Sequence, residues 1–386
     1  MSKLDELLRE LCPHGVEYKK IGKIANYEQP SKYIVESTDY NDAFDVPVLT
    51  AGQTFILGYT NESTGIFRAS KLNPVIIFDD FTGAFKWVDF SFKVKSSAMK
   101  IITASNDVLI RYLFHVMGFL HYSSNEHKRL WIGIYSEFEV PVPPLEIQRE
   151  IVRILDNFTN LTAELTAELT ARKAQYSYYR DKLLTFESRI QLLPLKDIAK
   201  FSYGYTDKAQ EHGDTRFLRI TDIAEDGTMK PEGAKYILLN DESKKYLVKK
   251  GDLLLARTGA TYGKTLYVPD NSPAVYASFL IKIELDNSKI SNRYYWHFSK
   301  SNQYWRQAEK LVSKGGQQQF NTNAVERVVV PVPPLDVQNR IVNVLDNFEK
   351  ICSDLNIGLP AEIEARQKQY EYYRDKLLTF KEVAAT

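Results

Sequence analysis

The sequence predicts an α+β protein in which two mixed α/β blocks are separated by two long coiled-coil helices. Residues 140–186 and 330–380 are two copies of one segment, opened by VPVPPLEIQREIVRILDNF and VPVPPLDVQNRIVNVLDNF and closed by QYSYYRDKLLTF and QYEYYRDKLLTF. In each copy the apolar residues fall three or four apart, which is the spacing of an amphipathic helix. The blocks between the copies alternate β-rich with turn-rich pieces. The duplication predicts a pseudo-two-fold internal repeat.

The N-terminal segment, residues 1–16, is expected to hold a short helix, KLDELLREL, that Pro13 and Gly15 terminate. This helix and the EYKKIGKIA after it resemble the end of the first copy, RDKLLTF, and the LLPLKDIAKF after that. We therefore interpret residues 1–16 as completing the C-terminal repeat, and we expect the two termini to lie close together.

The first variable block is residues 17–139. Strands are expected at DVPVLT, NPVIIFDD and FSFKVK, and a helix over residues 106–122. Asp79 and Asp80 follow one of these strands. Because adjacent strand residues point to opposite faces, the two carboxylates favour a turn cap over a metal site.

The central repeat is residues 140–192. Its prolines at 143 and 144 suit the start of a helix, where a missing N–H costs nothing. A helix over residues 145–186 would be roughly 60 Å long. Because a lone amphipathic helix of that length leaves its apolar stripe exposed, we expect it to pack on the second copy. Both parallel and antiparallel pairing fit this requirement.

The second variable block, residues 193–329, has the same rhythm as the first. Strands are expected at TRFLRITDI, GDLLLAR and AVYASFLIKIEL, and one helix over residues 291–312. The C-terminal repeat, residues 330–386, carries four extra residues, and Gly358 and Pro360 are predicted to end one helix and start another. The repeats share much sequence and the blocks little, which indicates a constant scaffold that presents two different readers.

Composition describes an ordinary soluble chain, with 44% hydrophobic and 26% charged residues and a net charge of +1. Two cysteines, Cys12 and Cys352, give no disulfide framework and no zinc site. The most apolar run, residues 108–120, is too short for a bilayer, and no signal peptide precedes it, so we expect a cytoplasmic protein without membrane contact. The nearest match to a phosphate loop, RTGATYGK, lacks the required glycine spacing. We interpret the chain as non-catalytic and without a bound metal.

Several loops combine Lys or Arg with Gly, Thr, amides and aromatic residues. Cations and backbone N–H groups suit phosphate, and polar side chains suit base edges, although similar loops close strands in any β-rich domain. The amides at residues 317–319 and 321 are candidate readers of adenine. The tyrosines of both YYRDKLL stretches are interpreted as helix-packing groups. The candidate DNA-binding residues are Thr50, Gln53, Tyr59, Lys86, Lys128 and Arg129 in the first block and Arg219, Arg257, Thr258, Tyr262, Lys264, Lys314, Gln317, Gln318, Gln319 and Asn321 in the second.

Taken together, these stretches resemble one known family along the whole chain. The motif PVPPL-x-x-Q-x-x-I-V-x-x-LD occurs at residues 141–156 and 331–346. The blocks add VPVLTAGQTFILGYTN, PVIIFDDFTGAF, FLRITDIAEDG and KKGDLLLARTGATYGK. All of them, in this order, look like the specificity subunit of a type I restriction–modification system.

The resemblance implies that each block is a target-recognition domain for one half of a bipartite duplex DNA site. The helical repeats would set the spacing and dock two methyltransferase subunits, and two restriction–translocase subunits would complete the enzyme. S-adenosylmethionine, ATP and Mg²⁺ would belong to those partners, with no cofactor on this chain. The alternatives are a coiled-coil adaptor whose end domains bind protein or glycan, and a nuclease domain hidden in a variable block.

Overall fold

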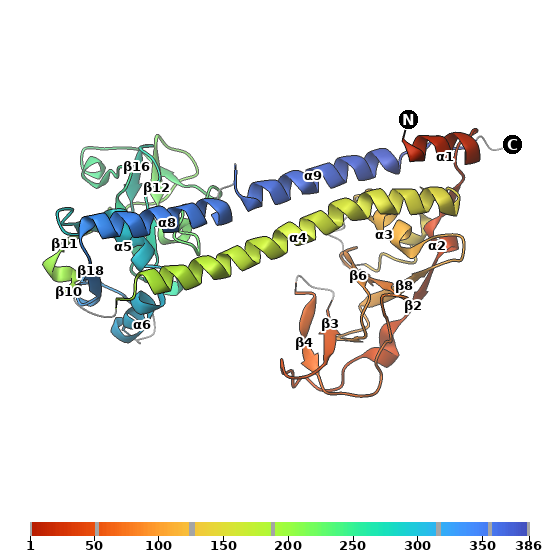
Figure 1. The fold of residues 1–386 in the computed structure, drawn as a ribbon, viewed down its shortest axis with the longest axis horizontal. Coiled ribbons are helices and arrows are strands. Elements are labelled where there is room, and N and C mark those ends of the chain that lie inside the picture. The colour runs from red at the N-terminus through yellow and green to blue at the C-terminus, as the bar shows by residue number, and fades with distance from the viewer. Residues whose placement is uncertain are drawn as a thin grey trace. The chain divides into compact units, whose positions relative to one another are not determined.

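The computed structural model describes residues 2–50, 54–122, 128–186, 190–313, 318–353 and 357–383 (Figure 1). The chain forms two compact units. Unit 1 consists of Met1–Glu164 with Ile363–Thr386, and unit 2 of Leu165–Glu362. Each unit therefore contains one variable block together with parts of both helical copies. Within the described residues, no helix is both long enough and apolar enough to cross a membrane.

The core of the unit 1 block is formed by a four-stranded sheet and a three-stranded sheet that pack on each other. The first is antiparallel, in the order β2 (Ala25–Glu28), β8 (Met99–Ala104), β5 (Val75–Asp79), β6 (Phe85–Val88), and the second has the order β4 (Ile56–Thr60), β3 (Val46–Leu49), β7 (Lys93–Val94). Strands β3 and β4 pair antiparallel, whereas β3 and β7 pair parallel.

Strand β5 shows why this sheet lies in the middle of the unit. All five of its residues are buried, because side chains alternate between two covered faces. Ile76 and Phe78 pack with helix α3 (Ile110–Phe119) and the start of helix α4 (Leu145–Leu183). Val75 and Ile77 pack with residues of the smaller sheet instead.

Five short elements complete the described part of the unit 1 block. Strand β1 (Tyr18–Lys20) pairs with β9 (Glu139–Pro141), and the one-turn helix α2 (Ile21–Ile24) follows β1. The 3₁₀ turns are η1 (Pro30–Tyr33) and η2 (Tyr135–Glu137).

Unit 2 repeats this topology strand for strand. Its larger sheet has the order β11 (Ala199–Tyr203), β17 (Leu280–Leu285), β14 (Leu253–Ala256), β15 (Thr265–Tyr267), and its smaller sheet β13 (Tyr236–Ile237), β12 (Thr215–Leu218), β16 (Ala274–Tyr276). Here too the last pair, β12 and β16, is parallel. The two blocks therefore share one fold although their sequences differ.

Helices and short turns complete the unit 2 block. Strand β10 (Gln191–Pro194) pairs with β18 (Val329–Val332), as β1 does with β9. The helices are α5 (Asn292–Phe298), α6 (Asn302–Leu311) and α7 (Thr322–Val325), and the 3₁₀ turns are η3 (Leu195–Asp197), η4 (Ile220–Asp222), η5 (Ser243–Tyr246) and η6 (Gly259–Thr261).

The helical copies pair antiparallel, whereas the sequence was compatible with both parallel and antiparallel pairing. The first copy is one helix of 39 residues, α4, and the second is α8 (Leu335–Ser353) followed by α9 (Leu359–Leu377). In unit 2, Tyr179 of α4 stacks on Phe348 of α8 with ring centroids 5.7 Å apart. In unit 1, Phe158 of α4 stacks on Tyr373 of α9 at 5.2 Å. Each pair joins the Phe of one LDNF motif to a Tyr of the other copy's YYRDKLL motif.

The prediction of two helices in the second copy is confirmed, and the predicted packing role of the tyrosines is confirmed in part. The second copy forms two helices, α8 ending at Ser353 and α9 beginning at Leu359, and Pro360 is the second residue of α9. The tyrosine prediction holds for Tyr179 and Tyr373, which stack on phenylalanines of the other copy. It does not hold for Tyr178 and Tyr372, which are 60% and 62% exposed.

The termini lie together in unit 1, as the sequence predicts. Helix α1 (Lys3–Leu11) is capped by Ser2, and the chain then reaches the end of the second copy. The backbone N–H of Val16 donates to the Lys381 carbonyl at 2.8 Å. Gly15 has φ +118°, and a Cβ at this position would lie 2.5 Å from the Lys381 oxygen, so the close approach requires glycine.

Several predicted elements have different bounds in the structure. The helix expected over residues 291–312 is two helices, α5 and α6, because the Ser301 hydroxyl caps a new helix start by accepting from the Tyr304 N–H. The helix expected over residues 106–122 is shorter, Ile110–Phe119. The AVYASFLIKIEL stretch forms two strands, β16 and β17, in different sheets. The TRFLRITDI strand ends at Leu218, since the Asp222 carboxylate accepts from the Arg219 N–H and closes a 3₁₀ turn.

Candidate nucleic-acid interface and its helical anchors

In unit 2 the block is fixed to the helices by four polar side chains. Arg293 and His297 project from α5 toward Asp346 of α8, and both contact its Oδ1, the Arg293 Nε at 2.8 Å and the His297 Nε2 at 2.6 Å. The other ring nitrogen of His297 lies 3.1 Å from the Tyr176 hydroxyl of α4. A neutral imidazole satisfies both contacts by donating from Nε2 to the carboxylate and accepting at Nδ1 from the tyrosine.

Unit 1 contains the same four residue types. The Arg111 Nε and the His115 Nε2 of α3 lie 2.7 and 2.9 Å from the Asp156 Oδ1 of α4. The His115 Nδ1 lies 3.0 Å from the Tyr370 hydroxyl of α9. Each set therefore ties one helix of the block to both helical copies, and we call these two sets the anchors.

Burial sets the protonation state of the anchor histidines. Both rings are fully buried. Burial lowers the pKa of His297 to about 4, helped by the charges of Lys300 and Arg293 and opposed by the hydrogen bond to Asp346. Burial also raises the pKa of Asp346, but the hydrogen bond from His297 and the charge of Arg293 outweigh that effect, so the net shift is downward. The anchor thus combines a neutral histidine with an ionised carboxylate.

The glutamine of each PVPPL-x-x-Q motif adds a second attachment. Gln148 is fully buried, accepts from the Leu109 N–H at 2.8 Å and donates to the Pro143 carbonyl at 2.8 Å. Gln338 accepts from the Ser291 N–H at 2.9 Å and donates to the Pro333 carbonyl at 2.8 Å. Because a buried amide must be satisfied, each motif specifies both the helix start and the approach of its block.

The anchors are not among the residues predicted from the sequence. A signal was present, because R-Y-x-x-H occurs once in each block, at residues 111–115 and 293–297. The tyrosine of this motif also repeats its contact. Tyr112 donates to the Pro141 carbonyl and Tyr294 to the Pro331 carbonyl, both at 3.0 Å.

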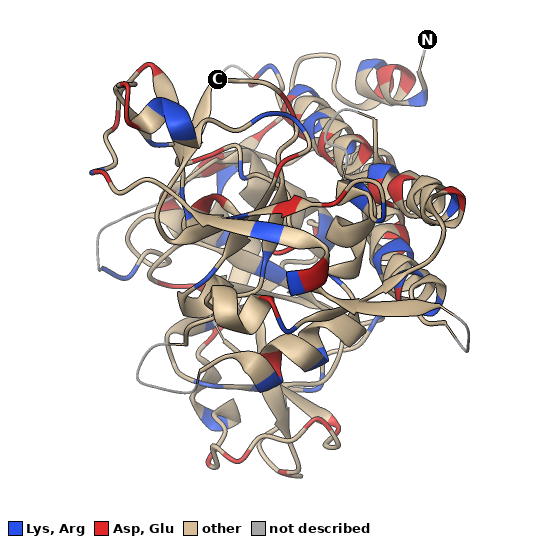
Figure 2. Cartoon of the chain, turned by 90° about the vertical axis from the view of Figure 1, so that its left-hand side faces the viewer, with Lys and Arg blue, Asp and Glu red and all other residues tan. Residues whose placement is uncertain are grey.

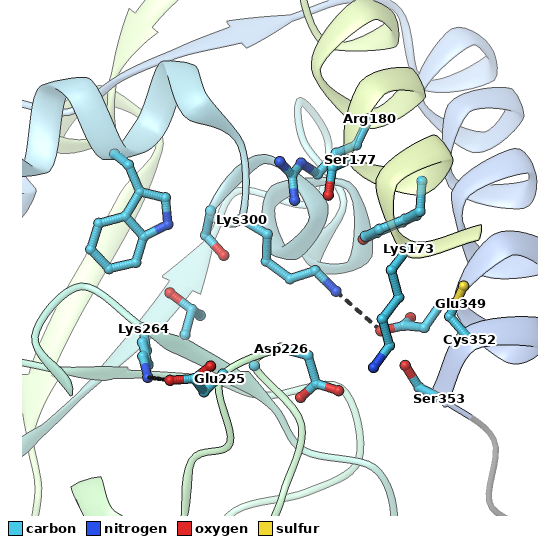
Figure 3. A pocket seen from close by; sticks show the side chains of 15 residues that line it. Lys173, Ser177, Arg180, Glu225, Asp226, Lys264, Lys300, Glu349, Cys352 and Ser353 are labelled. Carbon is cyan, nitrogen blue, oxygen red and sulfur yellow. Dashed lines mark hydrogen bonds and ion pairs between the residues drawn. The ribbon is translucent and has the colours of Figure 1, made fainter. Parts of the chain in front are cut away.

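Among the described residues, one group has the composition of a metal site, His297, Asp346 and Glu349, whose ligand atoms lie within 4.8 Å of one another. These acceptors are already occupied. Arg293 donates to Glu349 at 2.5 Å. Lys300 contacts the same carboxylate at 3.1 Å (Figure 3). Two cations within bonding distance leave this group unsuited to a metal ion.

In the second block the structure brings several candidate DNA-binding residues together at the end of β14. The Arg257 carbonyl accepts from the Phe320 N–H at 2.7 Å, and Thr258 forms a β-bridge with Gln319. The side chains of Gln318 and Gln319 are exposed, whereas that of Thr258 is buried. Arg257, Gln318 and Gln319 therefore form one cluster on this block.

Other candidates in the second block have different surroundings. Arg219 forms an ion pair with Asp222 at 3.0 Å and also donates to the Gly233 carbonyl. Lys264 lines a cavity of about 310 Å³ together with Lys173 of α4, and its ammonium lies 4.0 Å from Glu225 (Figure 3).

The two remaining described candidates of this block support the local fold. The Tyr262 ring contacts Phe320 with centroids 6.3 Å apart. The Asn321 side chain accepts from the Ala324 N–H at 3.1 Å and thereby caps α7.

In the first block, Lys86 on β6 and both Lys128 and Arg129 have exposed side chains. Thr50 directly follows β3 and Tyr59 lies in β4, and both are partly buried. Gln53, Lys314 and Gln317 lie outside the described residues. None of these placements tests DNA contact, so the sixteen candidates stay predictions.

The acidic pair of the first block acts in folding. The Asp79 carboxylate accepts from the Phe81 N–H at 2.9 Å and so caps a turn, as predicted. Asp80 forms a buried ion pair with Lys100 at 3.2 Å and accepts from the Trp131 N–H. Elsewhere, basic and acidic residues alternate along helices and loops (Figure 2), which agrees with the near-neutral net charge.

Two blocks of one fold, each anchored to the same duplicated helices and each with different exposed loops, define a scaffold protein with two distinct binding heads. The family described as type I restriction modification DNA specificity domain matches residues 13–172 and residues 188–365. The chain therefore belongs to this family of DNA specificity subunits. As a member of this family, the chain is the recognition subunit that supplies DNA sequence specificity, and it has no catalysis of its own.

Curated relatives match along almost the whole chain. A type I restriction enzyme specificity subunit of Escherichia coli is 40% identical over 419 residues, covering 98% of both chains. A putative type I restriction enzyme specificity subunit of Haemophilus influenzae is 30% identical over 392 residues, covering 95% of this chain and 96% of its own length.

Solved structures share the fold at low sequence identity. The specificity subunit of a type I restriction–modification system from M. genitalium gives a TM-score of 0.58 at 12% identity, over 94% of this chain and 96% of its own. A chain from a type I system solved to describe complex assembly and conformational transition gives 0.55 at 16%, over 94% and 97%.

Proposed function

We propose that each variable block reads one half of a bipartite sequence in duplex DNA and that the helical copies set the spacing between the halves. The observation that carries this proposal is the repeated topology, in which one strand order presents different exposed side chains on identical anchors. A scaffold that is constant while its loops vary suits two heads that read different base pairs. Helix α4 is one continuous helix of 39 residues, and its two halves belong to different units.

We further propose that two methyltransferase subunits dock on this chain, one for each helical copy, and that two restriction–translocase subunits join the assembly. Support comes from exposed positions that are identical in both copies. Tyr178 and Tyr372 are 60% and 62% exposed, and Lys182 and Lys376 are exposed as well. Packing within the chain does not require the same residue at these exposed positions of both copies. Docking of the same partner on each copy does require it.

In this proposal S-adenosylmethionine, ATP and Mg²⁺ act in the partner subunits and not in this chain. Among the described residues, the group with metal-type ligands, His297, Asp346 and Glu349, contacts Arg293 and Lys300. Because the ligand is duplex DNA, we place the assembly in the cytoplasm.

The proposal is tested by expressing the chain together with the methyltransferase subunit of the same system and measuring binding to genomic duplex fragments by mobility shift. We expect a complex that selects a subset of fragments and weakens steeply with salt, because phosphate contacts release counterions. A chain that binds no fragment in the presence of the methyltransferase, or binds all of them equally, would leave the protein-binding adaptor as the better account.

A further inference from the structure

We propose that Arg257 reads a guanine in the half-site recognised by the second block. This inference rests on the proposed function and names one specificity-determining residue within it. Arg257 directly follows strand β14, at the end of the larger sheet of unit 2. Its backbone is fixed on both sides, since its N–H donates to the Phe279 carbonyl at 3.1 Å and its own carbonyl accepts from Phe320.

The side chain of Arg257 is held as firmly as its backbone. The Nε donates to the Ser278 carbonyl at 3.1 Å. The guanidinium lies over two rings, with its central carbon 5.1 Å from the centroid of Tyr203 and 5.4 Å from that of Phe279. Both rings are about half exposed, at 42% and 51%. Exposed rings that orient an arginine form a surface suited to a planar ligand.

The rest of the guanidinium is free to bind a ligand. Among the described residues, Arg257 has no carboxylate partner, and its hydrogen bond uses Nε alone. The other arginine among the candidates of this block, Arg219, is neutralised by Asp222. The fork of two terminal nitrogens on Arg257 therefore remains available, in an orientation that the rings and the Nε contact determine.

The first block uses the same backbone position for a different purpose. Asp80 donates its N–H to the Ala98 carbonyl and accepts from the Leu130 N–H, the same pair of contacts that Arg257 makes with Phe279 and Phe320. Yet Asp80 is buried and neutralises Lys100 at 3.2 Å. One block thus closes this position with an internal ion pair, whereas the other presents an oriented cation, as expected of heads that read different bases.

The geometry of the free fork favours guanine. In the major groove guanine presents two acceptors, O6 and N7, on one edge, and a forked guanidinium binds both at once. Adenine and cytosine place an amino donor in the groove, which repels a donor-only side chain. A phosphate would also accept from this fork, and that alternative gives a different experimental result.

The experiment uses the full chain in complex with its methyltransferase partner. Methylome sequencing first gives the half-site read by the second block, and each guanine in that half is then replaced by 7-deazaguanine, which lacks only the N7 acceptor. For the wild-type complex we expect one position at which this replacement weakens binding about 5- to 150-fold. Arg257→Ala should lose a similar factor on the natural duplex and become insensitive to the replacement at that position.

Two further variants separate base reading from phosphate contact and from misfolding. Arg257→Lys keeps the charge but lacks the planar fork, so it should retain the salt dependence and show a reduced sensitivity to 7-deazaguanine. Lys250→Ala removes an exposed cation of the same block and should keep the sensitivity of the wild type.

Three results would overturn the inference. The first is a second half-site that contains no guanine. The second is an Arg257→Ala variant that weakens binding to every duplex equally and flattens the salt dependence, as loss of a phosphate contact does. The third is an Arg257→Lys variant that keeps the full sensitivity to 7-deazaguanine. Failure of the proposed function is distinguishable, because the wild-type complex would then select no duplex at all.

Discussion

Arg293, His297, Asp346 and Tyr176 come from three helices and make one connected set of hydrogen bonds. The set is costly to disrupt, because removing one member leaves buried polar atoms unpaired. Its equivalent in unit 1 uses the same residue types although the surrounding core differs. The repeated LDNF and QY-x-YY motifs therefore specify attachment of the blocks as well as pairing of the helices.

The anchor histidines make stability depend on pH. The pKa of His297 falls from the usual 6.5 to about 4 on folding, mainly through burial. Between these values the unfolded chain binds more protons, so stability is fully present above about pH 6.5 and is lost as pH falls toward 4. At about pH 5 the loss should be roughly 2 kcal/mol in the free energy of unfolding of unit 2, measured by urea titration.

His297→Gln should lower stability at neutral pH and remove this part of the pH dependence. His212→Gln, at an exposed position of the same unit, is the matched control and should keep it. An unchanged pH dependence in His297→Gln would show that another group is responsible.

The roles of individual residues were only partly predictable from the sequence. The turn cap by Asp79 followed from its position after a strand and is confirmed. The anchors were not predicted, since His115 and Tyr370 are 255 residues apart and only the folded chain brings them together. Arg219 was grouped with Arg257 as a candidate, but its ion pair with Asp222 could not be read from composition.

The helical elements were the most predictable part of the chain. Their apolar spacing predicted a long first helix, and Gly358 with Pro360 predicted the interruption of the second. The direction of pairing was not predictable, because both copies carry equivalent stripes. The stacked rings of Tyr179 on Phe348 and of Phe158 on Tyr373 establish it.

The exposed residues that are identical in both helical copies predict where partner subunits dock. In Tyr178→Ala or Tyr372→Ala, we expect one of two methyltransferase subunits to be lost, and in the double variant both, because each tyrosine would anchor one copy of the partner. Native mass spectrometry of the complex counts the subunits. Leu72→Ala, which alters a residue that is 92% exposed in the first block, is the control and should leave both bound. A double variant that still binds two subunits would exclude this surface.

At the scale of the whole molecule, the chain contains two blocks with the same fold. The sequence revealed the duplication of the helices but not that of the blocks, because the blocks keep strand order while changing most side chains. Strand β5 reads VIIFD and its counterpart β14 reads LLLA, two different sequences that both satisfy a buried central strand. The short R-Y-x-x-H motif occurs in both blocks, and its Arg and His contact the repeated helices.

The most direct test of the account replaces residues 18–139 by the corresponding block of another specificity subunit and maps methylated sites by methylome sequencing. If each block reads its own half, one half of the recognised sequence changes, while the other half and the spacing between them are kept. A chimera that methylates the original sequence, or one in which both halves change together, would contradict separate reading by two heads.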